Sequence, residues 1–335
     1  MVRVFTRLLV FALLAGGLAL GAAAWWLHSP MALNLPAGSA VLDLEIEPGT
    51  RAAQVADAAV ASGAQANLRL LQLWFRVSGQ ARQIKAGSYE ITPGTTPRRL
   101  LSMLVRGDQT LKSITLVEGW NFGQVRAALQ KAELLAPESI GLQPEIIMEK
   151  LGKPGIHPEG RFFPDTYTYA KGSSDMAVLK RAAKAMDKRL DAAWALRSPD
   201  TPLKSPEQAL IMASIVEKET GKPTDRALIA GVFTNRLRIG MLLQTDPTVI
   251  YGMGDKFDGN IRKRDLQLDT PYNTYTRGGL PPTPIAMPGK AALLAAVQPA
   301  PTKALYFVAR GDGTSQFSAT LDDHNRAVNK YIRGQ

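Results

Sequence analysis

The chain has 335 residues, with no cysteine and only three histidines. The absence of cysteine excludes disulfide bonds, zinc fingers, iron–sulfur clusters and thiol catalysis. Three scattered histidines leave too few ligands for a histidine-built metal site. We therefore expect the chemistry to come from carboxylates, hydroxyls, amides and basic groups, with no metal and no cofactor.

The composition is that of a folded, basic protein. Apolar residues make up 45% and charged residues 21% of the chain, and the length is sufficient for two or three domains. Lysine and arginine total 40 against 29 acidic residues, a net charge of +11. This excess favours an acidic partner, such as nucleic acid, anionic lipid or a polymer that carries carboxylates.

An uncharged apolar run at residues 8–27 predicts a single transmembrane helix, because about 20 helical residues span the hydrocarbon core. Arg3 and Arg7 precede the run and Trp25 and Trp26 end it, so we expect residues 1–7 in the cytoplasm and the rest across the membrane. A cleavable signal peptide is the alternative, although its apolar region is usually only about 7–15 residues long. Either way the chain leaves the cytoplasm, which excludes nucleic acid as a partner and favours the cell envelope.

The remaining chain divides into a tether at residues 28–40, a small module at 41–112 and a larger domain at 113–335. Three segments, at 46–50, 91–95 and 116–120, each combine strand-like residues, a glycine turn and a following helical pattern. Such a module is as consistent with glycan binding as with simple packing. Strands and helices do not alternate regularly, so the sequence predicts an α+β fold rather than a parallel α/β sheet.

A helix at residues 206–220 carries the strongest candidate for an acid catalyst. Ser205 is a good N-cap and Gly221 ends the pattern. Helical spacing places Glu217 on the apolar face, toward a core or cleft, and Glu219 on the opposite face, toward solvent. Burial and the negative end of the helix dipole would raise the pKa of Glu217, which suits a general acid near neutral pH. A buried but inactive acid and an exposed one are the alternatives.

Several hydrolase chemistries fit the sequence poorly. Ser214 lies in a helical pattern without a G-x-S-x-G turn, and the chain has no H-E-x-x-H motif. Glu217 and Glu219 diverge on their helix, so they cannot be the paired acids of a glycosidase. Either a distant acid (Asp165, Glu159 or Asp246) completes a pair, or the enzyme uses one carboxyl group and the substrate supplies the nucleophile. The irregular segment 269–288 is rich in proline, tyrosine and asparagine, a composition that suits binding of a sugar ring.

Five segments in order, at 214–220, 232–237, 240–252, 272–275 and 279–282, closely resemble the MltG (YceG-like) endolytic murein transglycosylases. The resemblance covers nearly the whole chain, including the N-terminal anchor and the module at 41–112, which is LysM-like. It implies a single-pass inner-membrane protein with a small LysM-like α/β module and a mixed α+β catalytic domain in the periplasm.

The resemblance also implies an activity, which is cleavage of the β-1,4 bond between N-acetylmuramic acid (MurNAc) and N-acetylglucosamine (GlcNAc) within peptidoglycan. The products would carry 1,6-anhydroMurNAc ends. Glu217 matches the catalytic glutamate, and the partners implied are glycan strands and a peptidoglycan synthase complex whose nascent strands the enzyme terminates. The residues that match motif positions and are expected to bind substrate are Asn235, Gln244, Asp246, Tyr272, Asn273 and Tyr275. A non-catalytic scaffold and a lysozyme-like hydrolase are the rival hypotheses.

Overall fold

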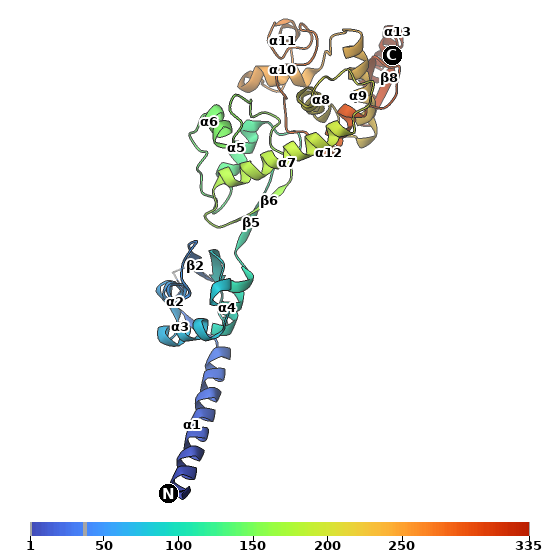
Figure 1. Cartoon of the computed structure of the whole chain (residues 1–335). Helices are drawn as coiled ribbons and strands as arrows, with labels where there is room; N and C mark the ends of the chain where they lie inside the picture. Colours follow the sequence, from blue (N-terminus) through green and yellow to red (C-terminus); the bar gives the residue numbers. More distant parts are fainter. Residues whose placement is uncertain (1, 36–38, 335) are drawn as a thin grey trace. The chain divides into compact units, whose positions relative to one another are not determined.

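A computed structural model describes residues 2–35 and 39–334, with the side chains of residues 2–9 and 12 outside the description. The chain folds into two compact units (Figure 1). Unit 1 comprises Met1–Lys112 and Tyr169–Ser173, and unit 2 comprises Ser113–Thr168 and Ser174–Gln335.

Unit 1 is built on an antiparallel pair of strands, β2 (Leu42–Ile46) and β4 (Gly87–Ile91), in the register Leu42↔Ile91. Residues of β2 are alternately buried and exposed, because one face of the pair packs on the core. Helices α2 (Ala52–Ala61), α3 (Leu68–Val77) and α4 (Pro97–Arg106) supply the rest of that core. A short 3-10 helix, η1 (Ala81–Gln83), precedes β4.

Residues 169–173 complete unit 1 although they follow it by more than fifty positions in the sequence. Lys171 forms an ion pair with Asp43 at 2.5 Å, and its carbonyl accepts a hydrogen bond from the Ser88 hydroxyl at 3.1 Å. Strands β5 (Leu111–Thr115) and β6 (Thr166–Ala170) form a two-stranded sheet, and the boundary between the units falls within both strands.

The three predicted β-turn-α segments are confirmed. Strands β2, β4 and β5 lead into helices α2, α4 and α5 (Phe122–Lys131), respectively. The turns contain Gly49, Gly94 and Gly119 with φ of 87°, 89° and 77°. These left-handed conformations favour glycine, which explains the repeated glycine in the sequence pattern.

The predicted membrane anchor at residues 8–27 lies within helix α1 (Val2–His28). Among the described residues, no helix combines the length and the apolar character needed to cross a membrane. Part of the predicted span, including the side chains of residues 8, 9 and 12, lies outside the description. The anchor therefore stays a prediction.

The structure differs from the predicted tether at residues 28–40. Met31 is buried in the core of unit 1 and its N–H donates to the Thr95 carbonyl at 2.9 Å. Strand β1 (Ala32–Leu33) pairs with β3 (Ala64–Gln65). This part of the chain therefore belongs to unit 1, because Met31 is buried in its core and Leu33 packs against that core. Residues 36–38 lie outside the described residues.

Unit 2 is mainly helical with one hairpin, so the predicted α+β class is confirmed. The hairpin is formed by the antiparallel strands β7 (Tyr306–Ala309) and β8 (Ser315–Ser318). The helices are α5, α6 (Pro144–Lys150), α7 (Asp175–Ala195), α8 (Pro206–Glu219), α9 (Pro223–Arg238), α10 (Asp246–Met253), η2 (Gly254–Lys256), α11 (Lys263–Gln267), α12 (Lys290–Val297), α13 (Leu321–Val328) and the π-helical η3 (Asn329–Arg333).

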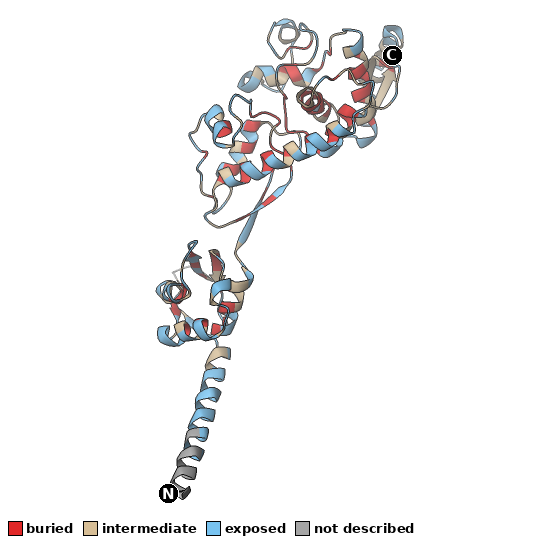
Figure 2. Ribbon diagram, viewed as in Figure 1, coloured by how far each residue is buried: buried red, intermediate tan, exposed pale blue. Residues whose placement is uncertain are grey.

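Helix α8 lies at the centre of unit 2 and is buried from Ala209 to Val216 (Figure 2). Helices α7, α9 and α12 pack around it. The Ser205 hydroxyl accepts from the Gln208 N–H, as its N-cap position predicts. Helix α9 begins at Pro223, with Lys222 at the N-cap, because proline is well suited to a first helical position.

Candidate active site

Glu217 lies in the last turn of α8, where its side chain is only 7% exposed. Its Oε2 accepts a hydrogen bond from the Gly289 N–H at 2.8 Å, at the start of α12. Its Oε1 lies 3.8 Å from Nη2 of Arg226 on α9. Three helices thus meet at this carboxyl group, and among the described residues Oε1 accepts no hydrogen bond.

The pKa of the Glu217 carboxyl is raised, chiefly by burial. The Gly289 N–H lowers the pKa by donating to the charged form, whereas the charge of Glu118 raises it. Arg226 and Lys218 lower it further. The upward direction predicted from the sequence is confirmed, and a raised pKa increases the protonated fraction that a general acid needs.

A cleft of about 860 Å³ lies beside Glu217. A Cβ added to Gly119, one of the residues in the cleft wall, would lie 4.0 Å from Cγ of Glu217, so the acid lies next to this wall although it is not itself a lining residue. The cleft is lined by Gly119, Asn121, Gly123, Gln124, Glu159, Lys218, Pro247, Ile250, Tyr251, Gly254, Asp255, Phe257, Tyr272 and Ile285. A cleft of this volume with aromatic, amide and carboxyl groups can hold sugar rings.

Glu159 forms a second buried carboxyl in the cleft wall. Both of its oxygens lie 3.1 Å from the Phe122 N–H at the start of α5, and the Tyr251 hydroxyl donates to Oε2 at 3.1 Å. Burial raises the pKa of Glu159 to about 7 despite these donors. These donors fix the Glu159 carboxyl against α5, which is a structural function. The sequence also allowed Glu159 to form a catalytic pair with Glu217, but none of these hydrogen bonds joins the two carboxyl groups.

The prediction that Glu219 faces solvent is wrong. Its carboxyl accepts a hydrogen bond from the Thr245 hydroxyl at 2.8 Å and lines a pocket of about 430 Å³. Burial is the largest cause that raises the pKa of Glu219 to about 7. Helical periodicity correctly separates Glu219 from Glu217, but segments distant in the sequence cover both sides of α8.

Three of the predicted substrate-binding residues line the same pocket as Glu219, namely Gln244, Asp246 and Tyr275. The Tyr275 hydroxyl donates to Asp246 Oδ1 at 2.6 Å. Gln244 has a φ of 50°, an uncommon conformation for a residue with a side chain. Such backbone strain is often found at ligand sites. Tyr272 lies elsewhere, in the cleft, with its hydroxyl 2.8 Å from that of Thr283.

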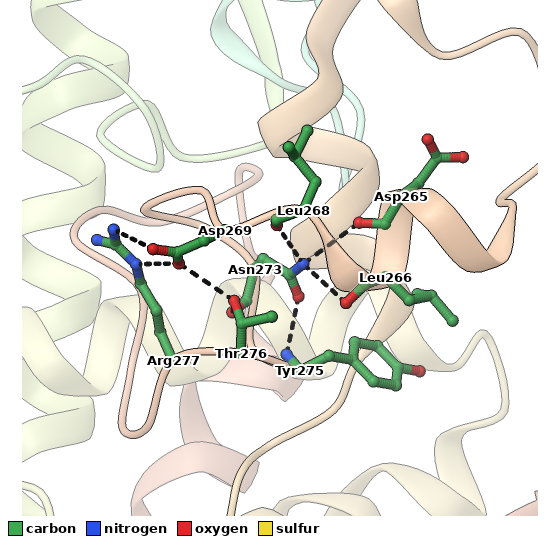
Figure 3. Close-up of polar contacts among 8 residues, drawn as sticks. All are labelled: Asp265, Leu266, Leu268, Asp269, Asn273, Tyr275, Thr276 and Arg277. Atoms are coloured by element: carbon green, nitrogen blue, oxygen red, sulfur yellow. Dashed lines mark hydrogen bonds and ion pairs between the residues drawn. The ribbon is translucent and has the colours of Figure 1, made fainter.

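The structure places the side chains of Asn235 and Asn273 against backbone carbonyls. The Asn235 amide donates to the carbonyls of Thr302 and Ala304 at 2.9 and 3.0 Å. The amide of the buried Asn273 donates to three carbonyls, those of Asp265, Leu266 and Leu268, and its Oδ1 accepts from the Tyr275 N–H (Figure 3). Both side chains therefore hold irregular backbone in place.

Two residues near Glu217 were missed by the sequence analysis, Glu118 and Arg226. Glu118 lies in the third glycine turn, whose pattern was interpreted only as local structure. Arg226 lies on α9, and no motif connects it with α8.

Among residues 2–35 and 39–334, no group of three or more histidine or acidic side chains could hold a metal ion.

Comparison with known proteins relates this arrangement to one family. A profile of the YceG-like family matches residues 44–330. A Bacillus subtilis protein named endolytic murein transglycosylase is 33% identical over 283 residues, which cover 79% of this chain and 77% of the relative. A Streptococcus pneumoniae protein of the same name is 28% identical over 287 residues, which cover 75% of this chain and 51% of that relative. This chain thus spans about half the length of the streptococcal protein.

A solved structure is also similar. The 2.6 Å crystal structure of a YceG-like protein from Listeria monocytogenes has a TM-score of 0.54 and 28% sequence identity. The match covers 86% of this chain and 98% of that one. The two proteins therefore share the fold over most of their length.

Asn273→Ala should lower the free energy of unfolding by about 1–3 kcal/mol, because three backbone carbonyls and one N–H lose a hydrogen-bond partner. Asp269→Asn is the matched control in the same loop, since it weakens a solvent-exposed ion pair with Arg277 and should cost much less stability than Asn273→Ala. Chemical denaturation of both variants measures the difference. Equal losses would show that Asn273 does not hold the loop.

Glu219→Gln should flatten the pH dependence of stability. The native carboxyl keeps its proton up to about pH 7, whereas the unfolded chain releases it near the ordinary value of 4.5. Native stability therefore falls as pH rises through this window, by about 1–3 kcal/mol from this group, and stays constant above it. Glutamine keeps an oxygen for the Thr245 hydroxyl but does not titrate.

Thermal unfolding between pH 4.5 and 8, followed by circular dichroism, tests this expectation. Glu149→Gln is the control, because Glu149 is exposed on α6. Parallel curves for wild type and Glu219→Gln would contradict a raised pKa at Glu219.

Proposed function

The chain belongs to the YceG-like family, and from this membership we propose that it is an endolytic murein transglycosylase. It would cleave the MurNAc-β-1,4-GlcNAc bond within peptidoglycan strands and leave 1,6-anhydroMurNAc ends. The observation that carries the proposal is Glu217, a carboxyl group with a raised pKa beside a cleft large enough for sugar rings.

Glu217 would act first as an acid and then as a base. The protonated carboxyl gives its proton to the glycosidic oxygen, and the C1–O4 bond breaks. The C6 hydroxyl of MurNAc attacks C1, the new C1–O6 bond forms, and the hydroxyl proton returns to Glu217. Because the substrate supplies the nucleophile, no water and no second carboxylate take part.

The Gly289 N–H suits this cycle. It donates to Oε2 of Glu217 and so stabilises the carboxylate that forms when the proton leaves. Oε1 is then the oxygen available to exchange the proton with the sugar. Fixing the carboxyl group before the substrate binds also reduces the entropy lost in reaching the transition state.

We assign the substrate contacts to two regions. Tyr272 offers an aromatic edge in the cleft, and Gln244, Asp246 and Tyr275 offer polar groups in the pocket at Glu219. Asn235 and Asn273 support the backbone of these regions and act on the glycan only indirectly. Glu217 is the single catalytic acid of the proposal.

The proposal places the enzyme at the inner membrane, with residues 8–27 as a single anchor, residues 1–7 in the cytoplasm and the rest in the periplasm. The support is the uncharged run, the preceding arginines and the exposure of apolar side chains such as Phe11, 72% exposed, and Leu18, 76% exposed. The module at 41–112, LysM-like by sequence, would position the catalytic domain at 113–335 beside a synthase complex, where cleavage ends a nascent strand.

Glu217→Gln should fold normally and lose at least about 10³-fold in rate, since the amide matches in shape but cannot give and reclaim a proton. Mass spectrometry of digested glycan strands provides the measurement. Anhydro ends with wild type support the proposal, reducing ends indicate hydrolysis by water, and intact strands indicate a scaffold. Glu149→Gln is the control, and near-normal cleavage by Glu217→Gln would place the acid elsewhere.

Two charges placed in the apolar run, Leu14→Arg with Leu18→Arg, should move the full chain from the membrane pellet to the soluble fraction. Each charged residue at the centre of a span costs about 2.5–3.5 kcal/mol on insertion scales. Carbonate-washed membranes probed for the protein give the readout. Retention of the double variant would show that residues 8–27 are not the anchor.

A further inference from the structure

The turn that contains Glu118 is attached to the segment before α12. The Gly119 N–H donates to the Met287 carbonyl at 2.9 Å, and the Met287 N–H donates to the Trp120 carbonyl at 2.7 Å. The Lys218 ammonium donates to the Gly119 carbonyl at 3.3 Å, which ties the same turn to the end of α8. These contacts fix the position of the Glu118 backbone relative to Gly289.

Gly289 brings two carboxyl groups together. Its N–H donates to Glu217, and the Glu118 carboxyl lies directly over its Cα. A Cβ at residue 289 would overlap Oε1 of Glu118. The backbone conformation at position 289 does not require glycine, because its φ of −79° is available to any residue. The missing side chain therefore leaves room for Glu118.

We propose that Glu118 is a positioning residue for the proposed transglycosylase, whose negative charge keeps Glu217 protonated until the glycan is bound. The inference rests on the proposed function, and it adds a second acid to a site that the sequence assigns to one. Glu118 is exposed and takes no part in bond cleavage. It acts on Glu217 through the electric field, since a nearby like charge disfavours ionisation.

The groups that face Glu217 come from four elements. Lys218 on α8 and Arg226 on α9 favour its ionised form, as does the Gly289 N–H at the start of α12. Glu118, on the turn before α5, is the only one that contributes a negative charge among the groups described. Without Glu118, two cations and an N–H favour the ionised form of Glu217, and burial is the one remaining contribution that favours the proton.

Glu118→Gln tests the proposal through the pH dependence of cleavage by the full chain. The basic limb of the kcat/KM profile reports loss of the proton from Glu217, and it should move to lower pH by about 0.5 units, because an exposed charge is partly screened. On the falling part of that limb the rate at a given pH should fall roughly threefold, which is the same shift expressed as a ratio. Glu118→Asp keeps the charge and should keep most of the profile.

The control is Glu149→Gln, which removes one exposed negative charge from α6. A shift of the same size in this control, or an unmoved limb in Glu118→Gln, overturns the proposal. A loss of rate that is equal at every pH would also overturn it, since a merely structural function has that signature.

A second measurement separates this proposal from the proposed function. The carboxyl carbon of Glu217 can be titrated by NMR in wild type and in Glu118→Gln without any substrate. A lower midpoint in the variant supports the positioning function even if the wild type does not cleave glycan, and equal midpoints overturn it. Absence of cleavage by wild type would count only against the proposed transglycosylase activity.

Discussion

The burial of α8 on all sides is the constraint on which the site depends. Its central residues from Ala209 to Val216 have no access to solvent, so the helix is fixed in orientation by α7, α9 and α12. The next turn has to leave this core, and it carries Glu217 and Glu219 into two different polar environments. Apolar packing thus determines where each carboxyl group lies and sets the burial that raises its pKa.

Three buried glutamates share a raised pKa, yet their surroundings give them different chemistry. Glu159 receives two kinds of donor and is fixed against the start of α5. Glu219 receives a hydroxyl from Thr245 and faces a pocket with Tyr275 and Asp246. Glu217 combines a single backbone donor with a cleft at its side. A raised pKa alone does not identify a catalytic acid, and our proposal of Glu217 rests on the backbone donor to its Oε2 together with the cleft beside it.

Local features could be predicted from the sequence because they depend on neighbouring residues. The glycine turns, the Ser205 cap, the hairpin and the direction of the Glu217 pKa follow from short patterns. The environment of Glu219 could not, because Thr245 and the hairpin that cover it are distant in sequence. Asn235 and Asn273 were expected at the substrate since amides suit sugars, but a buried backbone carbonyl needs a donor just as strongly. Glu118 reaches the site only through backbone pairing with Met287.

The return of residues 169–173 to unit 1 has a consequence for recombination between relatives. Lys171 contributes a charge for Asp43 and a carbonyl for Ser88, so the small unit is encoded by two separate stretches of the gene. A single crossover near residue 112 would leave Asp43 and Ser88 from one parent facing residues 169–173 from the other parent. Exchange of this unit as a cassette therefore requires three junctions, one in β5, one in β6 and one after residue 173, and evolutionary shuffling of the unit is correspondingly constrained.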